Sequence, residues 1–290
     1  MKSLLWTLSV LLVLPLPAAA EKVSFASLDG TTTLSAYLSV PRAQGPHPAV
    51  VMLHGCGGLG RDGGVSPRHL GWAGHLMRAG YAVLLLDSAG PRGFGATCGP
   101  GPERKVMWRD RPKDAYATLA FLQSRVGIDP ARIALMGWSQ GGGVVLLSIN
   151  SRSIGRPVTI SGPDFAAAVA LYPGACSERL QTRPFTDVPS GGWETAIPLL
   201  VLHGDADDWT PAGPCRDFIA AARARGQPVD MKIYPGALHG FDAPNLAPRR
   251  LEHITLRGGG SPTIGTDKAA RADALRAVPD FFARYLSPAR

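Results

Sequence analysis

One serine in this sequence stands in a setting that suits nucleophilic catalysis. Ser139 has glycines two residues before and two residues after it, Gly137 and Gly141. A mostly apolar run at residues 132–136 precedes it and small residues at 142–147 follow, the pattern of a strand that turns sharply into a helix. Such a turn exposes the hydroxyl to a base and a substrate, and leaves no room for side chains at the two glycines. We predict that Ser139 is a nucleophile, but so short a motif also arises by chance and needs partners elsewhere.

A serine nucleophile needs a histidine base and a carboxylate that orients the histidine. Three aspartates, Asp205, Asp207 and Asp208, follow the strand-like run at residues 199–202. Asp207 is the predicted acid, because it lies four residues before Pro211, a spacing usual for such acid loops. Asp208 is the fallback and Asp205 is less favoured. The alternative is that these aspartates cap the helix expected after Pro211.

The predicted base is His239. It follows the strand-like run at residues 229–234 and lies downstream of both Ser139 and the acid loop. A histidine beside glycine in a loop is often structural, but the chain order serine, acid, histidine favours catalysis. His239 would take the proton of Ser139 and return it to the leaving group.

A glycine-rich loop at residues 54–58 completes the expected site. Backbone N–H groups in such a loop can stabilise the oxygen that becomes negative in a tetrahedral intermediate. We assign this oxyanion hole to the backbone amides of Cys56 and Gln140, the residue after the nucleophile. The alternative of a phosphate cradle lacks its Gly-x-x-x-x-Gly-Lys-Ser/Thr signature.

Strand-like and helical stretches alternate along the chain. The predicted strands cover residues 34–40, 49–53, 81–86, 133–136, 166–171, 199–202 and 229–234, and the predicted helices cover residues 70–78, 111–125, 217–225 and 266–286. This alternation predicts the α/β class, with a mostly parallel, doubly wound sheet flanked by helices. Ligands bind at the carboxyl edge of such sheets, where the serine, acid and histidine loops would all open. Gly- and Pro-rich stretches at residues 90–102, 184–192 and 258–262 are predicted surface loops.

The first twenty residues have the composition of a secretory signal peptide. Lys2 precedes an apolar run at residues 4–16, and small residues lead to Ala20. The run is shorter than the about 20 residues of a membrane-spanning helix, so no stable membrane anchor is expected. We predict cleavage after Ala20, a single domain at residues 21–290, and a secreted or periplasmic location.

The four cysteines fit an oxidising compartment, where disulfides persist. Cys176 and Cys215 follow neighbouring strand-like regions, which favours pairing Cys176 with Cys215 and Cys56 with Cys98. Two other pairings, and four unpaired buried thiols, stay open. The cysteines and histidines lack zinc-site spacing, and no metal or cofactor is expected.

The formal net charge is +8, but the basic residues are scattered. No run of them is longer than Arg249-Arg250, and aromatic residues do not interleave with them. The pattern favours a solvated basic surface over nucleic-acid binding.

At its motifs the chain resembles the dienelactone hydrolase family, which has the α/β-hydrolase fold. The matching segments are residues 54–58, Asp87 with residues 91–93, and residues 137–142, 204–211 and 234–241. The resemblance implies a cofactor-free enzyme that acts on carboxylic esters or lactones. The family's founding members carry a cysteine nucleophile and a glutamate in the first loop, whereas this chain has Ser139 and the sequence His54-Gly55-Cys56.

We therefore expect an exported serine hydrolase that cleaves a small ester or lactone through an acyl-enzyme on Ser139. Trp138, Trp209 and Phe241 would form aromatic walls of the substrate pocket, although Trp138 alternatively packs beneath the serine turn. Two other functions stay open: a peptidase of the prolyl oligopeptidase type, and a non-catalytic envelope protein that uses the same fold for binding. The sequence says nothing about the oligomeric state.

Overall fold

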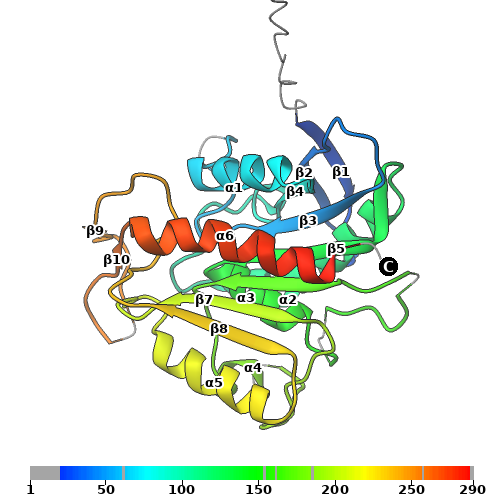
Figure 1. Ribbon diagram of the computed structural model, residues 1–290. Helices are drawn as coiled ribbons and strands as arrows, with labels where there is room; N and C mark the ends of the chain where they lie inside the picture. Colours follow the sequence, from blue (N-terminus) through cyan, green and yellow to red (C-terminus); the bar gives the residue numbers. More distant parts are fainter. Residues whose placement is uncertain are drawn as a thin grey trace, which may run out of the picture.

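A central eight-stranded sheet organises the molecule (Figure 1). The computed structural model describes residues 20–60, 63–152, 155–160, 162–183, 186–256 and 258–287. The strands are β1 Glu21–Ala26, β2 Thr33–Ser39, β3 His47–Leu53, β4 Ala82–Asp87, β5 Ile128–Trp138, β6 Ala167–Leu171, β7 Leu199–Gly204 and β8 Val229–Tyr234, with β9 Arg249–Arg250 and β10 Thr263–Ile264 as a separate small pair. The helices are α1 Pro67–Arg78, the 3₁₀ helix η1 Gly90–Arg92, α2 Pro102–Gln123, α3 Gln140–Ser148, α4 Glu178–Gln181, α5 Ala212–Ala224 and α6 Lys268–Tyr285.

The order of the strands confirms the predicted doubly wound α/β sheet. The sheet runs β1-β2-β4-β3-β5-β6-β7-β8. The strands from β4 to β8 pair in parallel, whereas β1 and β2 pair antiparallel at one edge. Parallel neighbours bring the loops after β3, β5, β6, β7 and β8 to one edge of the sheet, as the site requires.

Side chains alternate along each strand between two apolar layers. In β3, Val51 and Leu53 belong to the layer that contains side chains of α2, α3 and α5. Val50 and Met52 belong to the opposite layer, which contains side chains of α1 and α6. Because both faces are covered by helices, the central strands are continuously apolar, which explains the runs seen in the sequence.

Several elements differ from the prediction, among them β1, α2 and α5. Strand β1 was not predicted, because it is an edge strand in which only Val23 is fully buried. Helix α2 begins at Pro102 and not at residue 111. Its first turn has exposed charged residues, so the apolar periodicity does not extend to the true start. Pro112, which lies inside the helix, also pointed to a later start, because proline is usual in the first turn. Helix α5 begins at Ala212, five positions before the predicted residue 217. Its first turn holds Pro214, which is tolerated there.

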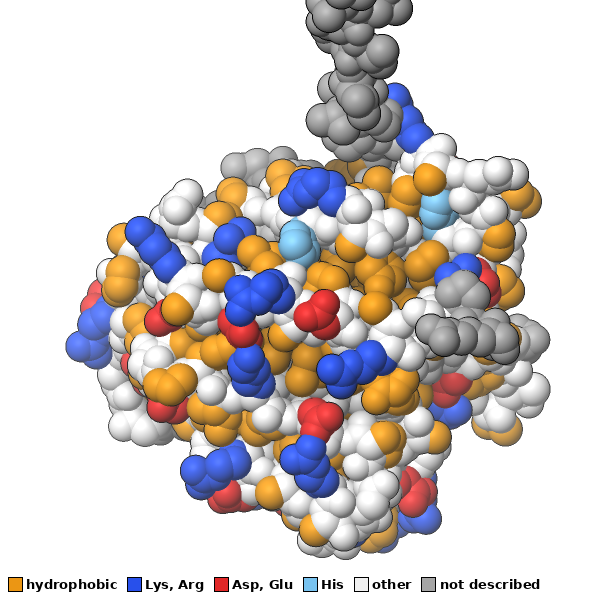
Figure 2. All heavy atoms as spheres, viewed as in Figure 1, with side chains coloured by type: hydrophobic (Ala, Val, Ile, Leu, Met, Phe, Trp, Pro, Cys, Tyr) orange, Lys and Arg blue, Asp and Glu red, His pale blue; other side chains and the backbone are white. Residues whose placement is uncertain are grey.

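Both favoured disulfides are present, so all four cysteines are paired. Cys56 bonds to Cys98 and Cys176 bonds to Cys215, with Cα–Cα distances of 4.8 and 4.7 Å. On the face shown in Figure 2, Lys and Arg side chains are dispersed among acidic and apolar ones. The predicted signal peptide lies outside the described residues, apart from Ala20. Among the described helices, none is long and apolar enough to cross a membrane.

Candidate active site

Ser139 occupies a tight turn between β5 and α3. Its backbone φ is 52°, a left-handed conformation that non-glycine residues rarely adopt. Its carbonyl oxygen accepts hydrogen bonds from the amides of Gly143, at 3.0 Å, and Gly174, at 2.7 Å. A Cβ atom on Gly137 would collide with the backbone of Gly141, and one on Gly141 would collide with the end of β3. The surrounding backbone therefore holds Ser139 in a strained conformation that a looser turn would relax.

The loops after β7 and β8 bring Asp207 and His239 into direct contact. Nδ1 of His239 lies 2.8 Å from Oδ2 of Asp207. The side chains are 6% and 0% exposed, respectively. Because an ionised carboxylate can only accept, His239 donates its Nδ1 hydrogen. This leaves Nε2 as the ring atom able to accept a proton.

Each aspartate of the acid loop has its own backbone partners. Oδ1 of Asp207 accepts the amides of Trp209, at 2.9 Å, and Thr210, at 2.8 Å, so this carboxylate also stabilises its own turn. Asp208 accepts the amide of Thr263 and Asp205 accepts that of Gly236. Among the three, only Asp207 contacts His239, and no aspartate side chain caps α5.

The environment favours the charged form of Asp207. Burial alone would raise the pKa of its carboxyl, but the charge and hydrogen bond of His239, with the amide of Thr210, outweigh burial. The net effect holds the pKa below its usual value. Asp207 is therefore ionised at neutral pH, as the orientation of a histidine base requires.

Aromatic rings pack around His239. The ring of Tyr172 lies edge-on at a centroid distance of 4.6 Å, and that of Trp209 lies at 4.8 Å. Tyr172 directly follows Leu171, whose carbonyl accepts the amide of Ser139 at 3.0 Å. The end of β6 thus contacts both the serine turn and the histidine. Among the described residues, however, no hydrogen bond joins the Ser139 hydroxyl to His239.

The expected aromatic walls are only partly correct. Trp138 and Phe241 are fully buried, so they cannot line an open pocket; Trp209 is half-buried. Trp138 packs beneath the serine turn, which was the alternative. Its indole donates at 2.7 Å to Oδ2 of Asp242.

Asp242 is a buried hub that the sequence did not reveal. Its Oδ2 also accepts the indole of Trp72 at 2.7 Å, and its Oδ1 accepts the hydroxyl of Tyr172 at 2.6 Å. The guanidinium of Arg68 lies 3.4 Å from Oδ1. One carboxylate thus links α1, the end of β5, the end of β6 and the histidine loop.

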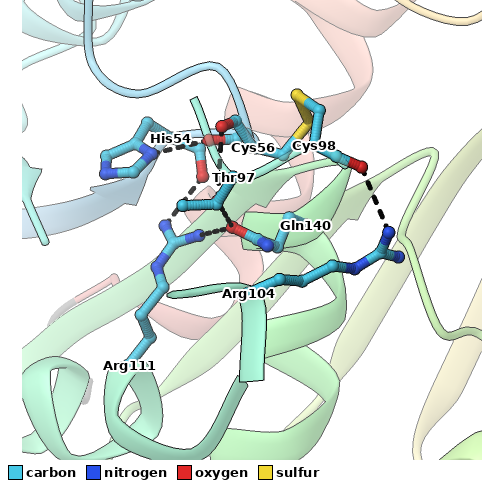
Figure 3. Close-up of a disulfide and its surroundings, with 8 residues drawn as sticks. His54, Cys56, Thr97, Cys98, Arg104, Arg111 and Gln140 are labelled. Carbon is cyan, nitrogen blue, oxygen red and sulfur yellow. Dashed lines mark hydrogen bonds between the residues drawn. A yellow bond between two sulfur atoms is a disulfide. The ribbon is translucent and has the colours of Figure 1, made fainter. Parts of the chain in front are cut away.

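The two backbone amides expected to form the oxyanion hole lie on neighbouring loops (Figure 3). Cys56 follows β3, and Gln140 begins α3, where the first N–H groups have no partner inside the helix. In the described chain neither amide donates to another residue. Thr97 connects the loops: its amide donates to the carbonyl of Cys56 at 2.7 Å and its hydroxyl to Oε1 of Gln140 at 3.2 Å. The disulfide to Cys98 anchors the same loop.

The described residues do not include a set of side chains suited to bind a metal ion. Groups of three or more His, Cys, Asp or Glu side chains that could hold a metal ion are absent from them. The candidate site combines the strained Ser139, the hydrogen-bonded pair of Asp207 and His239, and two backbone amides that have no acceptor among the described residues.

The sequence matches a family model and is similar to named proteins. The model of the "Dienelactone hydrolase family" matches residues 34–286. Quorum-quenching protein AidA of Acinetobacter baumannii is 35% identical over 130 residues, 45% of this chain and 39% of that protein. Dipeptidyl aminopeptidase BIII of Pseudoxanthomonas mexicana is 28% identical over 255 residues, 77% of this chain and 35% of that protein. The chain thus spans well under half the length of these two relatives.

Solved structures share the fold. The apo form of Thermogutta terrifontis esterase 2 is 19% identical, with a TM-score of 0.64, and the match covers 95% of this chain and 98% of that one. Together with the strand order, this similarity shows the α/β-hydrolase fold.

Proposed function

The chain belongs to the dienelactone hydrolase family, and we propose that it is a carboxylic ester hydrolase that cleaves an ester or a lactone through an acyl-enzyme on Ser139. The observation that carries this proposal is the buried contact between Asp207 and His239. A histidine held by an ionised carboxylate is a base whose free nitrogen can deprotonate a serine. The strained Ser139 lies on a loop at the same edge of the sheet.

The first half of the reaction acylates the serine. The Ser139 oxygen bonds to the substrate carbonyl carbon while Nε2 of His239 takes the hydroxyl proton. The carbonyl oxygen becomes an anion, which the amides of Cys56 and Gln140 stabilise. The carbon–oxygen bond to the leaving group then breaks, and His239 protonates the departing alkoxide.

The second half releases the acid. Water attacks the acyl carbon and gives one proton to His239, and a second tetrahedral intermediate forms. Its collapse breaks the bond to Ser139, which regains its hydrogen from His239. In a lactone the alcohol and the acid remain in one product molecule.

We also propose that the enzyme is exported, as a single domain at residues 21–290 after loss of the signal peptide. Two disulfides support this, because such bonds persist in oxidising compartments. Strand β1 begins at Glu21, directly after the proposed cleavage site, so cleavage would leave the sheet intact.

A second candidate function is peptide hydrolysis, which the similarity to dipeptidyl aminopeptidase BIII favours. The same triad would then attack an amide. A panel of p-nitrophenyl esters, lactones and aminoacyl p-nitroanilides separates the two functions by kcat/KM. Preference for the anilides would contradict the ester and lactone assignment.

Active-site labelling tests the proposal directly. The protein starting at Glu21 should be modified by a fluorophosphonate at Ser139, located by mass spectrometry of its peptides. Ser139→Ala should abolish both labelling and turnover of p-nitrophenyl acetate. Ser151→Ala, a change at an exposed serine, should leave both unchanged. A folded wild-type protein that neither labels nor turns over esters would instead support a non-catalytic binding role.

A further inference from the structure

Arg111 lies buried between the two loops of the proposed oxyanion hole. It comes from the middle of α2, and its side chain is 0% exposed. One terminal nitrogen donates to the carbonyl oxygen of His54 at 2.7 Å, and the other donates to Oε1 of Gln140 at 3.1 Å. Figure 3 shows the guanidinium reaching both acceptors from α2. It thus spans the loop after β3 and the first residue of α3.

The surroundings of the Arg111 charge are unusual for a buried arginine. Among the described carboxylates, none lies within ion-pair distance of it, and its Nε has no hydrogen-bond partner. Burial lowers its pKa to about 10, opposed in part by the charge of Asp114. The side chain is still a cation at neutral pH. Burying a cation without a counter-ion is costly, which is more often tolerated at functional sites than elsewhere.

Its two acceptors are tied to the oxyanion amides by short stretches of chain. His54 lies two residues before Cys56, and Gln140 itself supplies the other amide. Oε1 of Gln140 also accepts the Thr97 hydroxyl, so Arg111, Thr97 and Gln140 form one connected network. The planar guanidinium has donors in a rigid fork and can hold both acceptors at once, which an ammonium does less well.

We propose that Arg111 is the positioning residue of the oxyanion hole, which sets the distance between the amides of Cys56 and Gln140. This inference rests on the proposed function. Arg111 does not touch the substrate; it holds the two N–H donors where the tetrahedral intermediate needs them. Its loss would therefore weaken binding of the transition state more than binding of the substrate.

The test compares Arg111→Met with Gln140→Met and with the double variant. Each single variant should lower kcat for p-nitrophenyl acetate by about 10- to 100-fold and leave KM within about twofold. This loss in kcat is at most about that expected for removing a whole oxyanion donor. The affinity for a trifluoromethyl ketone, which forms a tetrahedral adduct, should fall in parallel with kcat. The double variant should be little worse than either single one, because each change alone already breaks the link that Arg111 makes between the loop after β3 and Gln140.

Two further variants separate positioning from general structural damage. Arg109→Met, at a 62% exposed arginine on the same helix, should keep wild-type kinetics. Arg111→Lys retains the charge but not the fork, so it should restore stability more than it restores kcat. If Arg111→Met does not fold, Arg111→Lys and Gln140→Met still measure the contact.

The outcomes distinguish this inference from the function beneath it. Wild-type kcat and ketone affinity in a folded Arg111→Met or Arg111→Lys enzyme would overturn the role of Arg111 alone. A loss confined to KM would do the same. A wild-type protein without Ser139-dependent turnover would overturn the proposed function and this inference with it.

Discussion

His239 and Asp207 are 32 positions apart in the chain, yet their side chains meet at 2.8 Å in the interior of the site. The neighbouring parallel strands β7 and β8 end side by side, so the loops that follow them are brought together. Asp208, the next residue, is exposed and accepts the amide of Thr263 instead. The turn that Asp207 stabilises therefore decides which carboxylate serves the histidine.

We predict that Asp207→Asn lowers kcat for p-nitrophenyl acetate by about 10³- to 10⁴-fold, because the amide no longer holds the required histidine tautomer. Asp208→Asn is the matched control and should stay within about twofold of the wild-type kcat. Steady-state kinetics at pH 7.5 measures both. Equal losses in the two variants would argue against the assignment of the acid.

The two disulfides should differ in their effect on activity. Replacing either pair by serines should lower the free energy of unfolding by about 2–4 kcal/mol, because each bond closes a loop of about 40 residues. Only Cys56→Ser/Cys98→Ser should also lower kcat, because that bond anchors the loop carrying the Cys56 amide. Urea unfolding and ester kinetics at 20 °C measure the two effects. A kcat loss in Cys176→Ser/Cys215→Ser of the same size would refute this difference.

Asp242 should contribute strongly to stability. Asp242→Ala leaves the indoles of Trp72 and Trp138 and the hydroxyl of Tyr172 without their acceptor, each at a cost of about 1–3 kcal/mol. Asp242→Asn keeps one acceptor oxygen, so it should lose less. Urea midpoints of the two variants give the comparison. Equal losses in the two variants would mean that the charge of Asp242, and not its hydrogen bonding, dominates at this position.

Acid should destabilise the protein partly through His69. Burial first, and then the charge of Arg68, lower the pKa of His69 from 6.5 to about 4. Between these values the unfolded chain binds a proton that the folded protein excludes, so stability is present above pH 6.5 and is lost as the pH falls towards 4. The slope for one such histidine reaches about 1.4 kcal/mol per pH unit.

His69→Gln removes this titration and keeps a side-chain N–H that can donate to the carbonyl of Leu59. Its free energy of unfolding, measured in urea from pH 8 to pH 4.5, should fall less steeply than that of the wild type below pH 6.5. Near pH 8 the His69 ring is neutral in both the folded and the unfolded state. The difference in free energy of unfolding between the two proteins should therefore not change with pH there. Parallel curves throughout would show that His69 does not titrate on unfolding.

Short-range sequence patterns predicted most of the fold. The continuous apolar runs predicted the central strands, because strands covered on both faces have no polar side. The glycines around Ser139 predicted its tight turn, because side chains there would collide with the end of β3 and the start of α3. Edge strand β1 and the first half of α2 were not predicted, because their many exposed positions interrupt the apolar periodicity.

The sequence by itself determined the α/β class, the loops that carry the serine, acid and histidine, and the edge of the sheet at which they open. These follow from chain order and local periodicity. Only the tertiary structure decided that Asp207 faces His239, that Asp242 joins Trp138 to Tyr172, and that Arg111 bridges two loops. Arg111 shares a helix face with apolar Ala115 and Leu119. A charged residue on such an apolar face is a sequence signal that could have singled out Arg111. Its partners could not be named, because the contacts of a buried charge depend on how distant segments pack.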